Sequence, residues 1–148
     1  SLARHDVEQL NVVNLTHQEK RTHAPDLVAT QLQVAANVRK HDPNHTLAIL
    51  EMVAKELKDP SLTQAHDLRA DFIAVASTVM KEQVGRATLN EELKKIAQTV
   101  SQDLPLGSSE RTAAESKIED VEKQTIKLLS VVAERKKMAE RSLEHARA

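Results

Sequence analysis

The sequence has no cysteine, tryptophan or tyrosine, and it has a single phenylalanine among its 148 residues. Without cysteine the chain can form neither a disulfide framework nor a thiolate-based zinc or iron–sulfur site. The scarcity of aromatic side chains argues against a typical ligand pocket, an aromatic interface hot spot or a platform on which nucleic-acid bases stack. Several common classes of binding protein are therefore disfavoured from composition alone.

Glycine and proline are also rare, with two and four residues respectively. A many-stranded sheet uses such residues in its turns, so their scarcity favours helices. The longest apolar run, Phe72 to Ala76, is far shorter than the roughly 20 residues that a membrane-spanning helix needs. The segment SLARHDVEQL is acidic where a secretory signal would be basic and then apolar. We therefore expect no membrane span and no targeting segment.

What remains is a balanced composition of 40% hydrophobic and 29% charged residues, with a formal net charge of −1. These proportions are typical of one soluble globular domain that can bury its own core. Prolines punctuate the first part, because proline is well tolerated at the first position of a helix. Asp42 and Asp59 directly precede two of them and are suited to cap the helix start. Helices are therefore predicted over 25–41, 43–58 and 60–84.

Two more helices are predicted on either side of these three. Before Pro25, apolar residues recur at helical spacing from Ala3 to Val13 and lead to His17. After Gly85, Thr88 is placed to cap a helix whose apolar stripe begins at Leu89. Residues 105–109 contain a proline and a glycine, which indicates a linker between a compact part, 1–104, and a long C-terminal helix, 110–148.

The C-terminal helix changes character along its length. Its first half has an apolar seam through Ile118, Val121, Leu128 and Val132, but the same spacing then meets Arg135, Ala139 and Ser142. We predict that the part from about Glu134 onward projects past the body or meets a second chain. The predicted contact residues of this projection are Met138, Leu143, Arg135 and Arg141.

Together these patterns predict an all-α bundle of five to six helices with a long C-terminal helix. The segment LAILEMVAKEL is apolar on nearly all faces, which predicts that the helix over 43–58 lies at the centre. The predicted core consists of Leu47, Leu50, Val53, Leu57, Leu68, Phe72, Val75, Leu93, Ile96, Val121 and Leu128.

Histidines supply the only candidate metal ligands that the sequence suggests. His41 and His45 are four residues apart, a spacing that can share a metal ion on a continuous helix. Pro43 lies between them and predicts a helix break, which favours two surface histidines instead. Six of the seven histidines fall within the first 66 residues, which leaves a pH-dependent change of packing open.

Motifs for catalysis are not evident. No glutamate is followed by histidine three residues later, as a helical di-iron site would require, and no serine lies in a glycine-flanked elbow. The basic residues of the last helix are interleaved with glutamates, an arrangement unlike a surface that tracks phosphates. We therefore expect no cofactor, no catalytic residues and no nucleic-acid partner.

The sequence thus favours a structural or protein-interaction module without catalytic activity, which binds a protein partner or itself through helix faces. Two alternatives remain open at this point. One is an engineered or de novo designed helical protein with no biochemical function, although helical residues such as Asn11 and Thr30 are unlike idealised design. The other is a small-ligand or metal-binding helical protein.

Overall fold

The computed structural model describes residues 17–147. This part consists of helices α2 (His17–Val38), α3 (Pro43–Glu56), α4 (His66–Glu82), α5 (Ala87–Gln102) and α6 (Ser109–Arg147), with a 3-10 turn η1 (Pro60–Leu62) and no strand. The predicted all-α class with a long last helix is confirmed. None of the helices in the described part combines the length and apolar character needed to cross a membrane. The helix predicted from Ala3 to Val13 lies outside the described residues.

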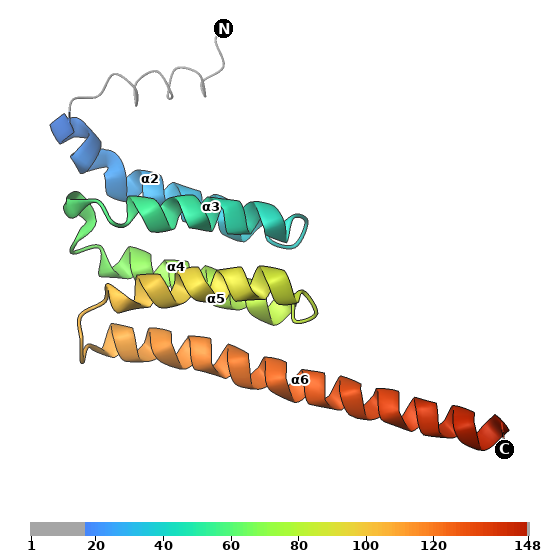
Figure 1. Ribbon diagram of the computed structural model, residues 1–148. Coiled ribbons are helices and arrows are strands. Elements are labelled where there is room, and N and C mark those ends of the chain that lie inside the picture. Colours follow the sequence, from blue (N-terminus) through green and yellow to red (C-terminus); the bar gives the residue numbers. More distant parts are fainter. Residues whose placement is uncertain (1–16, 148) are drawn as a thin grey trace, which may run out of the picture.

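The helices stack in three layers (Figure 1). α2 and α3 form one antiparallel hairpin, α4 and α5 form a second, and α6 covers the second hairpin. α4 contacts α2, α3, α5 and α6, so α4 is the central helix. The prediction that the helix over 43–58 would be central is therefore wrong.

The error about the central helix has a simple physical reason. The apolar residues of α3 are spread over nearly all of its faces, but not all of these faces are packed. Ala48 and Met52 face solvent, and Met52 is 49% exposed. In contrast, α4 buries the polar residues Arg69 and Ser77 among its apolar ones. A buried polar residue makes the packed face of a helix look narrower in the sequence than it is in the fold.

Aspartate side chains cap the starts of α3 and of the 3-10 turn η1. The Asp42 carboxylate accepts a hydrogen bond from the His45 backbone N–H at 3.1 Å, and Asp59 accepts one from the Ser61 N–H at 2.8 Å. Both aspartates are thus caps, as predicted. Thr88 is not a cap, because α5 already begins at Ala87.

Two prolines behave differently from the prediction. Pro25 lies inside α2 and does not start a helix. Its ring removes one backbone donor, but Ala24 and Val28 on either side of it pack on the core and hold the helix in place. Pro60 starts only the 3-10 turn, and the buried Leu62 directs the chain inward before α4 begins at His66.

The core lies between the three layers and continues to the first third of α6. Of the predicted core residues, Leu50, Val53, Leu57, Phe72, Leu93 and Val121 are buried, and Leu47, Leu68, Val75 and Ile96 are partly buried. Leu128 is 44% exposed, so its assignment to the core is wrong. The last buried residue of α6 is Val121, because the body has no further layer beyond that point.

Candidate interaction surface

The histidine pair does not form a site in the structure. His41 lies in the turn between α2 and α3, His45 lies in the first turn of α3, and both are exposed. The carboxylate of Asp42 between them is engaged in capping α3. Across residues 17–147 no group of three or more potential ligands is placed to hold a metal ion.

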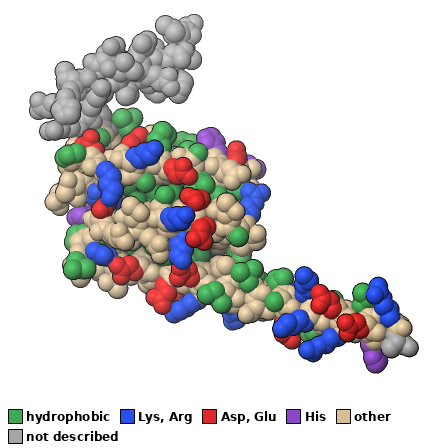
Figure 2. Space-filling model, viewed as in Figure 1, with side chains coloured by type: hydrophobic (Ala, Val, Ile, Leu, Met, Phe, Trp, Pro, Cys, Tyr) green, Lys and Arg blue, Asp and Glu red, His purple; other side chains and the backbone are tan. Residues whose placement is uncertain are grey.

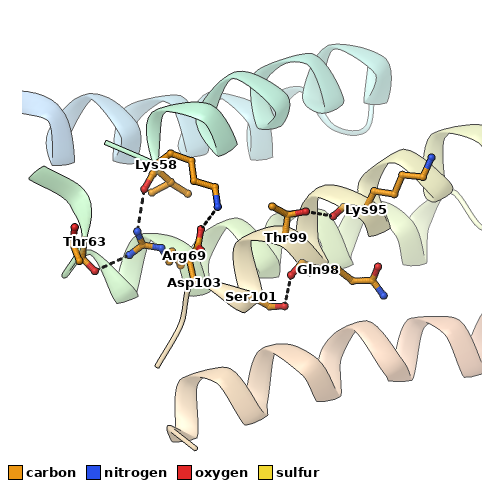
Figure 3. A network of polar contacts seen from close by, with 9 residues as sticks. Lys58, Thr63, Arg69, Lys95, Gln98, Thr99, Ser101 and Asp103 are labelled. Carbon is orange, nitrogen blue, oxygen red and sulfur yellow. Dashed lines mark hydrogen bonds and ion pairs between the residues drawn. The ribbon is translucent and has the colours of Figure 1, made fainter. Parts of the chain in front are cut away.

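A polar network joins the ends of three helices (Figure 3). The buried guanidinium of Arg69 on α4 donates to the Leu57 carbonyl at 3.0 Å and to the Thr63 carbonyl at 3.3 Å. Nearby, Lys58 after α3 donates to the carboxylate of Asp103 after α5 at 2.7 Å. Burial lowers the pKa of Arg69, and the charge of Asp103 opposes this by raising it.

This network is structural in character. Arg69 satisfies carbonyls that the end of α3 and the following turn leave without helical partners. Because its donors are directed at backbone oxygens, the network fastens the first hairpin to the second. Sequence reasoning missed Arg69, although its position three residues before Phe72 on the packed face of α4 was a usable signal.

The base of α6, residues 109–125, is fixed firmly to the body. Ser108 caps the helix by accepting a hydrogen bond from the Arg111 N–H at 3.1 Å, and Gly107 adopts a φ of 79° in the preceding turn. Ile118 and Val121 are buried, and helices α4 and α5 both contact α6. An ion pair between Lys94 on α5 and Glu122 closes the base, and hydrogen bonding to Glu122 raises the pKa of Lys94.

Beyond the base, residues 126–147 form an arm that extends away from the body (Figure 1). All of these residues are exposed. Apolar and charged side chains are interleaved on the arm (Figure 2). The projection predicted from about Glu134 is thus observed, and it begins earlier than expected. The arm carries six basic and three acidic residues, which gives a formal net charge of +3 within a chain whose total is −1.

One side of the arm continues the side of α6 that packs on the body. At 3.6 residues per turn, Leu129 follows Ile118 by about three turns, Val132 by about four and Leu143 by about seven. Ile118 is 5% exposed, whereas Leu129, Val132 and Leu143 are 55%, 53% and 54% exposed. We define the arm stripe as the residues on this side, namely Leu129, Val132, Lys136, Ala139, Leu143 and Ala146.

The predicted contact residues fall on different sides of the arm. Leu143 was predicted to be displaced from the seam, but the turn count places it in line with Ile118, because a straight helix has 3.6 and not 3.5 residues per turn. Arg135 lies beside the stripe. Met138 follows Ile118 by about five and a half turns, so Met138 and the neighbouring Arg141 point away from the stripe. All four side chains are exposed.

Comparisons with protein-family models, curated proteins and solved structures gave no match. The arrangement itself offers one continuous helix whose apolar stripe is not covered by any other helix within residues 17–147.

Proposed function

We propose that this chain is a non-catalytic helical interaction module. Its body, residues 17–125, holds the arm in a fixed direction. The arm presents its stripe to a helix of a protein partner. Binding would then bury apolar side chains that solvent now surrounds, which is the dominant favourable contribution in most protein–protein association.

A single observation carries the proposal. The same side of one continuous helix is buried at Ile118 and exposed at Leu129, Val132 and Leu143. Isolated apolar residues on a protein surface are ordinary, but apolar residues that recur along one helix side indicate an interaction site. The stripe has the spacing of anchors in helix-to-helix recognition, about one or two per turn.

Site-specific photo-crosslinking in cells tests this proposal. A photoreactive residue at position 129 lies on the stripe, while one at position 131 replaces Val131 on the far side of the same helix. We expect a discrete protein adduct from position 129 that is much weaker from position 131. Adding Val132→Glu should abolish the adduct, because a charge on the stripe would be desolvated without a partner. Equal labelling from both positions would contradict the proposal.

A further inference from the structure

We infer that the protein helix covering the arm stripe is the arm of a second copy of this chain, packed antiparallel to form a two-fold symmetric dimer. This inference rests on the proposed function and names the partner. It is argued from the way the body limits access to the stripe and from the residues that face each other.

The body permits only one direction of pairing along the stripe. At the base of α6 the same helix side is already covered by α4 and α5. A parallel partner would bring its own base to the same end, where its body would collide with these helices. An antiparallel partner keeps the two bodies at opposite ends of the paired arms, so each stripe is free along its full length.

The stripe residues then set the register. The stripes face each other when Arg147 of one arm lies level with Leu128 of the second, so each tip ends two residues short of Ile126, where the other arm begins. In this register the facing pairs along the stripe are Leu129 with Ala146, Val132 with Leu143, and Lys136 with Ala139. Two of these pairs match a large apolar residue with an apolar partner, and each occurs twice by symmetry.

Lys136 is the polar exception within the stripe, and the same register accommodates it. It faces the small Ala139 of the second copy, which leaves room for the lysine stem to lie across the seam. The next residue, Glu140, is then within reach of the ammonium group, so two reciprocal Lys136–Glu140 ion pairs form. A single polar residue in a helical seam is known to select register and orientation at some cost in stability.

The charge of the arm gives the dimer a recognisable salt dependence. Two arms of net charge +3 repel each other over distances that salt screens. Self-association should therefore strengthen as salt is added. An acidic helix of another protein would be attracted to the arm and would bind more weakly in salt.

Sedimentation equilibrium of the purified full chain tests the inference. We expect a monomer–dimer equilibrium that shifts toward dimer between low and moderate salt. Val132→Glu should weaken the dimer by about tenfold or more, since it places an unpaired charge against Leu143. Val131→Glu is the matched control, because it makes the same change on the far side of the helix and should leave the dimer intact.

Charge reversal tests the register. Lys136→Glu and Glu140→Lys should each weaken the dimer, since each variant places like charges opposite one another. The double variant restores opposite charges and should recover most of the lost affinity. Two single variants without effect, or a double variant that is no better than either, would overturn the antiparallel register.

The outcomes separate this inference from the proposed function. A chain that stays monomeric at all salt concentrations, yet gives a stripe-specific adduct with another protein, would overturn the dimer and leave the interaction module standing. A monomer without any stripe-specific adduct would overturn both. A dimer weakened equally by Val131→Glu and Val132→Glu would show that a different surface holds the copies together.

Discussion

The base and the arm of α6 are two parts of one uninterrupted helix with opposite surroundings. In the base, the apolar side meets α4 and α5, and Ala114, Ile118 and Val121 are buried. In the arm, the same side continues with leucine and valine, but no helix of the described chain covers it. The sequence pattern is thus shared, while burial depends on whether a neighbouring layer is present.

This difference explains where the stability of the molecule resides. Most helical stability in proteins comes from packing of one face, and the arm lacks that packing within a single copy. The body, with its central α4, should therefore carry nearly all of the free energy of unfolding. Substitutions placed in each region test whether the free energy of unfolding is divided in this way.

The largest effect is expected at the centre of the body. Phe72 is the only aromatic residue of the chain and is fully buried on α4. Phe72→Ala should lower the free energy of unfolding by about 3–5 kcal/mol, because it removes apolar contacts and leaves a cavity. Urea unfolding followed by circular dichroism measures this loss.

The matched variant in the arm is Leu129→Ala, measured in protein dilute enough to be monomeric. We expect a change of under about 0.5 kcal/mol, since surface substitutions rarely exceed this. A loss at Leu129 comparable with that at Phe72 would mean that the arm folds back onto its own body, and the distinction between the two regions would fail.

The division into a packed body and an exposed arm was largely predictable from the sequence, and each wrong prediction has a physical cause. The helical class, the caps at Asp42 and Asp59 and the projection of the last helix follow from local patterns that need no tertiary information. The exposure of Leu128 and the central position of α4, in contrast, depend on which helices are neighbours. A spacing pattern cannot supply that, because it marks an apolar side without showing what covers it.

The candidate surface was predicted in part for the same reason. Exposure of the arm could be anticipated from its increasing polarity after Ala133. Reading the seam in heptads misplaced Leu143, whereas counting 3.6 residues per turn along a single straight helix returns it to the side of Ile118. Arg69 was overlooked because a charged residue on an apolar face normally argues for exposure, and here backbone carbonyls compensate it.

A moderate effect is expected at the polar network of the body. Arg69→Leu removes the donors to the Leu57 and Thr63 carbonyls. These two carbonyl oxygens would then remain buried or partly buried without their hydrogen-bond partner. The expected loss is about 1–3 kcal/mol in the free energy of unfolding. Lys58→Leu serves as the control from the same network. It removes a solvent-exposed ion pair to Asp103 and should cost under about 1 kcal/mol. Equal losses would show that Arg69 contributes no more than a surface charge.

A smaller effect is expected where the base of α6 meets α5. The Lys94–Glu122 pair raises the pKa of Lys94 above its ordinary value of 10.5, so the folded state holds this proton more tightly than the unfolded state. Its contribution is therefore present in full below pH 10.5 and is lost as the pH rises through the raised pKa. The pair is partly solvated, so we expect a loss of at most about 1 kcal/mol.

Urea unfolding at pH 9 and pH 11 measures this contribution, and the absence of tyrosine removes one group that would otherwise titrate in the same window. Lys94→Gln isolates the pair from the other lysines. The difference in stability between wild type and Lys94→Gln should shrink as the pH rises. A difference that stays constant across this range would show that the pair does not fasten the base.

The smallest effect on the body is expected from removing the end of the arm. Truncation after Lys137 removes residues 138–148. Residues 138–147, which include Ala139 and Leu143 of the stripe, are all exposed. In dilute solution the free energy of unfolding should stay within about 0.5 kcal/mol of the full chain, and the melt should remain cooperative. The helical signal should fall only by the share of the residues removed.

Association, in contrast, should weaken strongly, because the truncated stripe retains Val132 but has lost the Leu143 that would cover it in the second copy. If the truncated chain unfolded at much lower denaturant, the arm would belong to the body and the contrast between packed base and uncovered arm would not hold.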